Sequence, residues 1–532
     1  MKEGNVQSTR THTTPWNELW VSAADRNGIA ISFEGTWSWL MIHSTPIPDK
    51  GVLDLWSSEW LRVMKKYRNH PSVFFWTVNN EMKFYDLDAD TERAKQKFRI
   101  VSDVVKDMRK TDPTRPVCFD SNYLHNKASK RFGDDFLKTV DDGDIDDNHA
   151  YYNWYDYSVF RFFNGEFQKQ FKSPGRPLIS QEMSTGYPNA ETGHPTRSYQ
   201  LIHQNPYSLI GYEAYDWGDP ASFLNTQSFI TGELAETLRR TNEQASGIMH
   251  FAYMTWFRQC YDHRNIQPYP TYYAMQRAMQ PVLVSAELWG RNLYAGEKLH
   301  TRIYVVNDNE EGRDLKPTSL AWSIVDETNK VLASGTEQFP AVEYYGRKYI
   351  EPNIHMPSNL PADKVNVKLK LTLTESGVTL SQNEYGLLVA RKEWNISQVT
   401  ASKKILLLDK DHMKATLDFL NIACQTVPSI KELLNAKQKA NLCIISGLKE
   451  CTDEEARLLR EYQSKGGRIL FLNSKEAAQK VYPEYITGWI IPTEGDIVVM
   501  ERNDAPVFDG IGALELRYFN NNKREIPLAC TA

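Results

Sequence analysis

The chain has 532 residues and a nearly balanced charge, since 62 basic and 67 acidic residues give a net charge of −5. This balance argues against nucleic acid as the main partner. No run reaches the ~18–20 consecutive apolar residues that cross a bilayer, so neither a membrane protein nor a membrane partner is predicted. The length predicts about three domains. The six cysteines lack metal-ligand or disulfide-framework spacing, and we interpret them as reduced and structural.

The first 280 residues alternate short apolar strands with amphipathic helices such as Leu19–Asn27, Trp56–Tyr67 and Thr91–Lys110. Repeated strand–helix units of this size predict a parallel barrel or a doubly wound sheet. The count of strands is one short of a (β/α)₈ barrel. The seven predicted strands are Asn5–Thr9, Ile29–Phe33, Phe74–Val78, Pro116–Phe119, Ile145–His149, Pro177–Gln181 and Ile248–Thr255.

Two of these strands end near a glutamate. The strand from Phe74 leads through Asn80 to Glu81, and the strand from Pro177 ends at Glu182. Buried parallel strands usually carry function at their C-terminal ends. A carboxyl group beside apolar walls should have a raised pKa, as a general acid requires. For Glu81 alone, capping of the next helix is an equally good interpretation. If both glutamates face one barrel mouth, they match the pair of a retaining glycosidase, ~5–5.5 Å apart.

Five segments in order resemble the catalytic barrel of glycoside hydrolase family 2, the β-galactosidase, β-glucuronidase and β-mannosidase family. The strongest match is Arg68-Asn69-His70-Pro71-Ser72 followed by Trp76 and Asn80-Glu81, which is similar to the acid/base signature of the family. The other matching segments are Asn5–Pro15, Asp144–Tyr155, Arg176–Glu182 and Trp256, which resemble the second-strand, sixth-strand, nucleophile and eighth-strand segments.

The resemblance implies that Glu81 is the acid/base and Glu182 the nucleophile. It also implies that Asn80 binds the sugar 2-hydroxyl, that Arg10 and Tyr151 or Tyr152 bind the nucleophile, and that Trp256 forms an apolar platform. His149 and Glu34 are further substrate-binding candidates. Glu34 either contacts a sugar hydroxyl or supports the residues that touch the sugar. Core packing is the alternative for each Tyr and Trp, and His12 has either a core or a substrate role. Double displacement requires no metal or organic cofactor.

Two features limit the assignment. The Asn-x-Lys motif that binds uronic acids in glucuronidase-like members is not found near residues 257–267, so specificity for uronic acids is not expected. The acidic run Asp141–Asp147 suggests calcium but does not match an EF-hand loop, so we interpret it as a solvated surface loop.

The remaining sequence predicts two further domains. Residues 281–395 show period-two patterns that resemble an immunoglobulin-like β-sandwich. Residues 396–532 follow a β-α-β order typical of a small doubly wound domain. It resembles the glutamine-amidotransferase-like domain of some glycosidases, although no cysteine occupies a nucleophile elbow. In the family, a jelly-roll and an immunoglobulin-like domain precede the barrel. We therefore expect residues 1–280 to be a barrel that lacks its first strand, in an N-terminally truncated chain whose last domain is also incomplete.

The sequence predicts a retaining, β-galactosidase-like exo-β-glycosidase acting on terminal β-linked sugars of oligosaccharides or other glycosides. One alternative is a catalytically inactive fragment that serves as a carbohydrate-binding or assembly module, because an open barrel exposes sheet edges. Another is a (β/α)₈ hydrolase that cleaves internal bonds. A homo-oligomer stays open, and so does the compartment: a leader peptide ahead of the barrel would direct the protein to the periplasm or outside the cell.

Overall fold

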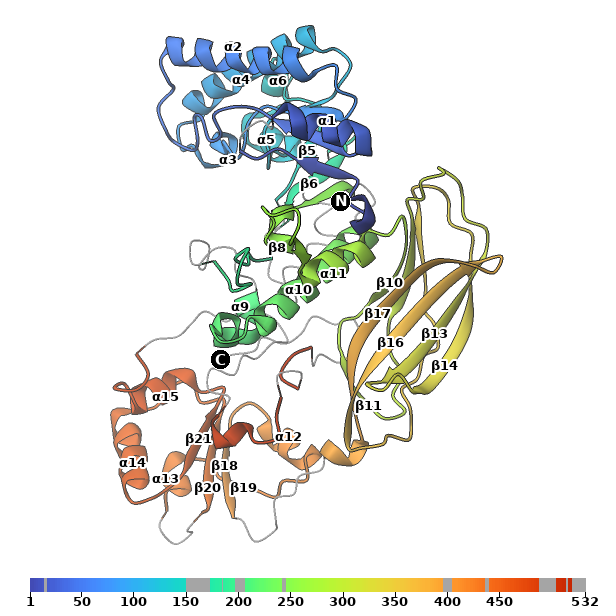
Figure 1. Cartoon of the computed structure of the whole chain (residues 1–532). Coiled ribbons are helices and arrows are strands. Elements are labelled where there is room, and N and C mark those ends of the chain that lie inside the picture. Colours follow the sequence, from blue (N-terminus) through green and yellow to red (C-terminus); the bar gives the residue numbers. More distant parts are fainter. Residues whose placement is uncertain are drawn as a thin grey trace.

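The computed structural model describes residues 1–13, 17–149, 173–183, 185–196, 206–241, 245–395, 404–435, 440–487, 504–512 and 515–518. Three parts follow one another along the chain (Figure 1): a mixed α/β part, a β-sandwich and a smaller α/β part. Within these residues, no helix combines the length and apolarity that crossing a membrane requires.

Parallel strands form the interior of the first part. One sheet has the order β1 (Ser8–Arg10), β2 (Ala30–Glu34), β3 (Val73–Thr77) and β4 (Val117–Cys118). The second has the order β5 (Asp146–Asp147), β6 (Leu178–Met183) and β7 (Ala245–His250). All seven predicted strands are thus present among the described residues, in the predicted order.

Gly143 joins the two sheets. It forms a bridge with Cys118, and the next amide, Asp144 N–H, donates to the Val117 carbonyl. The φ of Gly143 is +76°, and a Cβ atom here would lie 2.5 Å from the carbonyl oxygen of Val117. Only glycine fits this close approach without strain. These contacts fasten the turn before β5 to the edge strand β4.

Helices cover the outside of this sheet. In α1 (Glu18–Asn27), the side chain of Asn17 caps the first turn and Gly28 ends the helix at a φ of +63°. The other helices are α2 (Lys50–Tyr67), α3 (Phe84–Leu87), α4 (Thr91–Thr111), α5 (His125–Phe132), α6 (Asp134–Leu137), α9 (Pro206–Ile210), α10 (Ala221–Thr241) and α11 (Pro270–Ala278). A short hairpin of β8 (Phe257–Arg258) and β9 (Gln267–Pro268) precedes α11.

Aromatic packing fixes α2 on the sheet. The helix buries Trp56, Trp60 and Tyr67 along one face. The Trp60 ring packs edge-to-face on Trp76 of β3, and Tyr67 packs on Phe33 of β2. Such ring pairs add to the free energy gained from burying apolar area. This packing sets the positions of β2 and β3, whose C-terminal ends lead to the candidate site.

The outer edges of β1 and β7 face each other across a cavity of about 640 Å³. No other strand in the described ranges pairs with either edge. Because Ala30 N–H donates to the Gln7 carbonyl and Thr11 N–H donates to the Ser32 carbonyl, the backbone groups of Ser8 and Arg10 point toward the cavity.

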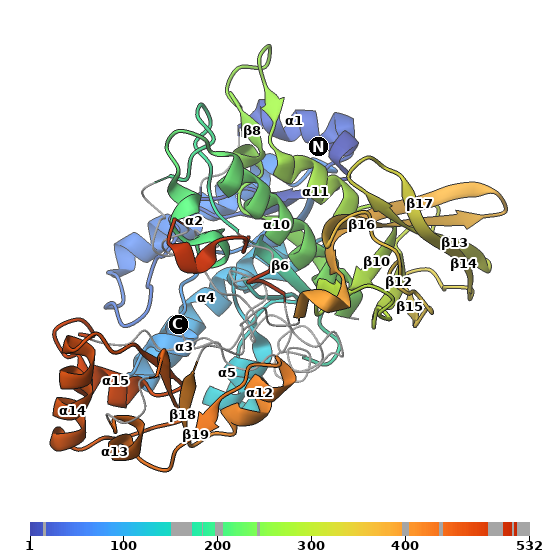
Figure 2. The same cartoon turned by 90° about the horizontal axis from the view of Figure 1, so that it is seen from below.

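The second part is a β-sandwich. One sheet has the order β10 (Val282–Glu287), β12 (Arg302–Asn307), β15 (Arg347–Ile350), and the other has the order β11 (Asn292–Tyr294), β17 (Val378–Ala390), β16 (Lys364–Glu375), β13 (Thr318–Asp326), β14 (Val331–Phe339). Residues such as Leu369 and Leu371 of β16 alternate inward and join Val284 and Val305 in one core. Both views place the sandwich beside α10 and α11 (Figures 1 and 2).

The third part is a parallel sheet with helices. The order is β19 (Gln425–Thr426), β18 (Ile405–Asp409), β20 (Leu442–Ser446), β21 (Ile469–Leu472), and every pairing is parallel. Its helices are α12 (Met413–Phe419), α13 (Ile430–Leu433), α14 (Asp453–Ser464) and α15 (Lys475–Val481). Thr452 and Glu455 form a capping box at the start of α14. Strands and helices alternate here, as the predicted β-α-β order requires.

Candidate active site

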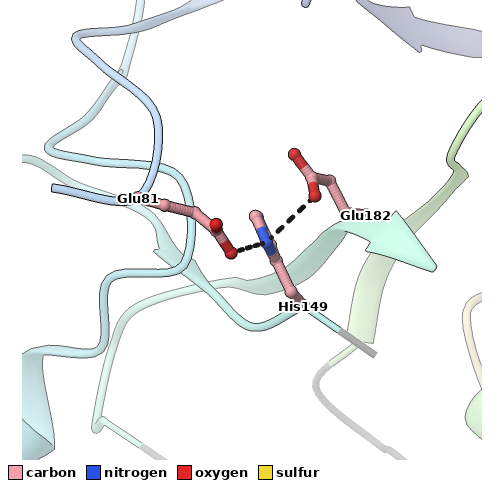
Figure 3. A group of neighbouring side chains, drawn as sticks. All are labelled: Glu81, His149 and Glu182. Carbon is pink, nitrogen blue, oxygen red and sulfur yellow. Dashed lines mark hydrogen bonds and ion pairs between the residues drawn. The ribbon is translucent and has the colours of Figure 1, made fainter. Parts of the chain in front are cut away.

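The structure brings Glu81 and Glu182 together, although 100 residues separate them in the chain. One carboxylate oxygen of Glu81 and one of Glu182 lie within 4.8 Å of each other. Nδ1 of His149 lies between them, 2.7 Å from Oε1 of Glu81 and 3.2 Å from Oε2 of Glu182 (Figure 3). Glu81 follows β3, Glu182 lies in β6 and His149 follows β5, so three strand ends supply the group.

The backbone at Glu81 is strained. Its φ is +50°, a left-handed conformation that non-glycine residues seldom adopt. The Glu81 amide donates to the carbonyl of Ser121, and Asn80 forms a bridge with the same residue. These contacts with the segment after β4 hold the backbone and direct the Glu81 side chain toward His149.

The pKa of Glu81 differs from the sequence prediction. Burial raises the pKa of this carboxyl group. The hydrogen bond and positive charge of His149, together with Lys83, have the larger opposite effect, and the resulting pKa is about 2. Nζ of Lys83 lies 2.9 Å from Oε1 of Glu81. The expected raised pKa is therefore wrong for this arrangement, because two cations face the carboxylate.

His149 is a buried cation. Burial lowers its pKa, but the charges of Glu182, Asp147 and Glu81 raise it to about 10. Its Nε2 lies 2.8 Å from Oγ of Ser121, which in turn donates to Asp147. An imidazolium donates from both ring nitrogens, so His149 links the two glutamates on one side to Ser121 and Asp147 on the other.

Arg10 organises the opposite side of the site. Its Nη1 donates to Oε1 of Glu182, its Nε donates to Oε2 of Glu34 and its Nη2 donates to Oδ1 of Asn80, each over 2.6 Å. The Arg10 side chain is buried, and the charges of Glu34 and Glu182 outweigh that burial and raise its pKa. His12 Nδ1 lies 3.3 Å from Oε2 of Glu34. Arg10 thus supplies the compensating charge for two buried carboxylates.

Trp256, the predicted apolar platform for the sugar, is buried. It is 2% exposed, its indole N–H donates to Nδ1 of His250, and its ring packs on Tyr253. It also lines the cavity between β1 and β7. Core packing accounts for these contacts, and the platform role stays a prediction. Tyr151 and Tyr152 lie outside the described residues.

The acidic run before β5 is largely buried, so the predicted solvated loop is wrong. Asp142 accepts hydrogen bonds from Tyr123 and His125, and Asp146 pairs with Arg176 at 2.8 Å. Asp147 faces the site. Partners from other segments neutralise these charges, which a local sequence pattern does not reveal.

Sequence reasoning missed several residues around the carboxylates. Lys83 pairs with Glu81, Asn122 donates to Glu81 over 3.4 Å, and Ser121 and Asp147 position His149. Lys83, only two residues after Glu81, was visible in the sequence as a nearby charge. Ser121 and Asn122 follow the strand predicted at Pro116–Phe119, a location that could have marked them.

The spacing of Glu81, His149 and Glu182 would also suit a metal ion held by three side chains. A metal ligand must be a deprotonated imidazole. Because His149 has a raised pKa and donates to the carboxylates, it carries a proton in this arrangement. A metal ion held by these three side chains would therefore have to displace the proton of His149.

Comparisons with known proteins point to glycoside hydrolases. Residues 1–219 match the sequence model described as "Glycosyl hydrolases family 2, TIM barrel domain". A β-galactosidase of Pectobacterium atrosepticum is 22% identical over 390 residues, which cover 69% of this chain and 32% of that enzyme.

One solved structure shows a similar fold over part of its length. A β-D-mannosidase from Dictyoglomus thermophilum has 18% identity and a TM-score of 0.50, over 73% of this chain and 46% of that one. An exo-chitosanase of Amycolatopsis orientalis has 13% identity and a TM-score of 0.47, over 72% and 45%. The chain thus spans about a third to a half of the length of these relatives. The barrel part of this chain therefore matches glycoside hydrolase family 2 over residues 1–219.

Proposed function

We propose that the chain carries the catalytic centre of a retaining exo-β-glycosidase that hydrolyses terminal β-linked sugars. The spacing of the two carboxylates is the observation that carries the proposal. Retaining enzymes hold their carboxyl groups ~5–5.5 Å apart, whereas inverting enzymes leave ~6.5–9.5 Å for a water molecule. Oxygens of Glu81 and Glu182 within 4.8 Å of each other fit the retaining class.

In the first step, a carboxylate oxygen of Glu182 attacks the anomeric carbon and the bond to the leaving oxygen breaks. Glu81 gives its proton to that oxygen. In the second step, Glu81 takes a proton from water, which attacks the anomeric carbon and releases Glu182. Arg10 holds Glu182 at 2.6 Å and fixes the attacking group. Asn80, held by the same guanidinium, is the proposed partner of the sugar 2-hydroxyl.

Protonation of Glu81 requires a change at His149. With a pKa of about 2, Glu81 is ionised at neutral pH while His149 contacts it. A sugar ring that enters between the carboxylates must occupy the space where Nδ1 of His149 now bridges them. Loss of that contact raises the pKa of Glu81, because a positive charge is removed from a partly buried carboxyl group. We infer that substrate entry itself prepares the acid.

A β-galactoside is the first substrate to test. Support comes from the curated relative, which is a β-galactosidase. A panel of aryl β-glycosides with different terminal sugars identifies the preferred sugar. Product sizes from a longer oligosaccharide separate exo from endo action, since exo cleavage releases monosaccharide from the first turnover.

The nucleophile assignment is tested with Glu182→Ala. Turnover of the preferred aryl β-glycoside should fall to background, and added azide should restore product by taking the place of the missing carboxylate. Glu92→Ala is a matched control, because Glu92 lies exposed on α4. Unchanged turnover in Glu182→Ala would eliminate the proposed mechanism.

A non-catalytic carbohydrate-binding module is the second candidate. The observation that favours it is that β1 and β7 are not paired with each other among the described strands and line one cavity. A purified chain that binds sugars but hydrolyses none of the panel would support it.

We also propose finer identities for the two appended parts: an immunoglobulin-like domain at residues 281–395 and a non-catalytic glutamine-amidotransferase-like domain at residues 396–532. The two packed sheets support the first. The order β19-β18-β20-β21 supports the second, since it is the central pattern of doubly wound sheets. Cys443, inside β20, is fully buried, which supports a structural role for that thiol.

A further inference from the structure

The loop between β2 and α2 carries two exposed indoles at the C-terminal end of the barrel strands. Trp37 is 37% exposed and Trp39 is 43% exposed. Single exposed apolar side chains are common and need no explanation. These two differ because the loop around them is both strained and tied to the candidate site.

The strain lies in the backbone. Trp37, Trp39, Met41 and His43 all have positive φ, between +46° and +63°. Non-glycine residues seldom adopt this conformation, and it persists only where the surroundings impose it. These four residues alternate along the loop. A preference for turns does not explain their positive φ, because none of them is Gly, Asn or Asp, the residues that favour turns of this kind.

Residues next to Glu81 impose the conformation. The buried side chain of Asn79 accepts a hydrogen bond from the Trp39 amide over 2.9 Å and donates to the Trp37 carbonyl over 3.0 Å. The amide of His43 donates to the carbonyl of Met82 over 2.8 Å. The loop is therefore fastened on both sides of Glu81, the proposed donor of a proton to the leaving group.

Trp39 also lies close to Glu182. Its ring contacts His12 edge-on, with ring centroids 6.1 Å apart. Nδ1 of His12 lies 3.9 Å from Oε1 of Glu182. Oγ of the neighbouring Ser38 donates to Glu34, the partner of Arg10. One side chain thus separates the exposed indole from the proposed nucleophile.

We propose that Trp39 is the platform for the leaving-group sugar, which makes the substrate class a β-linked oligosaccharide rather than a glycoside of any small alcohol. The inference rests on the proposed function. A pyranose ring presents an apolar face that an exposed indole can cover. The leaving sugar departs on the side of the group that protonates it, and the loop is fastened at Asn79 and Met82 on that side.

Trp37 provides a matched control in the same loop. Its indole N–H donates to Glu59 of α2 over 3.0 Å, so hydrogen bonding holds this ring against the helix. It has similar exposure and similar φ, and no role in the site is assigned to it.

The test compares two substrates that share the preferred terminal sugar: a disaccharide and the corresponding glycosyl fluoride, which has no leaving sugar. Trp39→Ala should lower kcat/KM at least tenfold for the disaccharide and change it less than about twofold for the fluoride. Trp39→Phe should recover most of the loss, and Trp37→Ala should leave both values within about twofold. An equal loss on both substrates, or no loss on either, would overturn the proposal.

A binding measurement keeps the two proposals separable. In the Glu182→Gln background, calorimetry with the disaccharide should give a Kd at least tenfold weaker after Trp39→Ala and unchanged after Trp37→Ala. If the parent chain hydrolyses no substrate, the proposed function fails, while the calorimetry still decides the subsite. The Trp39 proposal is refuted if the affinity is equal with and without the indole, or if the Glu182→Gln parent does not bind the disaccharide.

Discussion

Replacing His149 by glutamine should raise the pKa of Glu81 by at least about 2 units. In the structure, the pKa of this carboxyl group is about 2, against an ordinary value of 4.5. The difference of about 2.5 units corresponds to about 3.4 kcal/mol in favour of the ionised form, at 1.36 kcal/mol per unit. His149 contributes both a hydrogen bond and a charge to this difference, ahead of Lys83.

The sign follows from the charges. The amide side chain introduced by His149→Gln would carry no charge, so Glu81 would keep only Lys83 as a cationic neighbour while burial and the carboxylate of Glu182 favour its protonated form. A glutamine side chain still offers an N–H donor to Ser121. The substitution therefore removes the charge at the centre of the site and keeps a polar side chain in its place.

The pKa is measured by ¹³C NMR of protein labelled at the Glu side-chain carboxyl, with Glu81→Gln to assign the resonance. The alkaline limb of kcat/KM should move upward with it, since the proposed first step needs protonated Glu81. His125→Gln is the matched control, because His125 pairs with Asp142 at 2.6 Å in another part of the barrel. A shift of Glu81 below about 0.5 unit in His149→Gln would refute the electrostatic account of this site.

Three further predictions concern stability. Arg10→Met should cost about 3–5 kcal/mol in urea unfolding, because two buried carboxylates lose their counter-charge; a loss below about 1 kcal/mol would contradict the structure. The pKa of His149 is raised from 6.5 to about 10, so its stabilising contribution is complete below pH 6.5 and disappears as pH rises toward 10. Tm should fall across that range, and fall less in His149→Gln; parallel curves would argue against a buried imidazolium. Glu236→Leu should cost about 1–3 kcal/mol, since Ser285, Asn383 and Tyr385 of the sandwich all hydrogen-bond to this carboxylate of α10. Glu236→Gln should cost less, and equal losses would show that the hydrogen bonds contribute little.

Much of the barrel could be predicted because its signals are local. Strands β2 and β3 lie in short apolar runs, and α1 is bounded by a capping Asn17 and by Gly28, whose effects act within a few residues. The start of α2 was predicted at Trp56, six residues late, because the buried face begins there while the exposed first turns begin at Lys50. The spacing of apolar residues shows which helical residues are buried. An exposed helix end has few apolar residues, so its first residue is hard to predict.

The electrostatics of the site could not be predicted because they depend on distant partners. A strand-end glutamate beside apolar residues suggests a raised pKa, but His149 lies 68 residues along the chain and reverses the shift. Asp146 looked solvated for the same reason, since Arg176 lies 30 residues further on. The Trp39 loop has no periodic pattern at all, and the contacts that fix it come from Asn79, which the sequence presented only as a strand end.

The polar contacts between β1 and β6 have a consequence for how this protein can evolve. In most enzymes, catalytic side chains are a burden on the fold, and replacing them trades activity for stability. Here Arg10 of β1 reaches across the interior to Glu182 of β6. Nearby, Ser32 of β2 donates to Gln181 of β6. The same polar side chains that would handle a sugar also fasten the two sheets to each other. Selection for a new chemistry at Arg10 or Glu182 would therefore loosen the scaffold, and adaptation is more accessible through the loops around the mouth than through these strands.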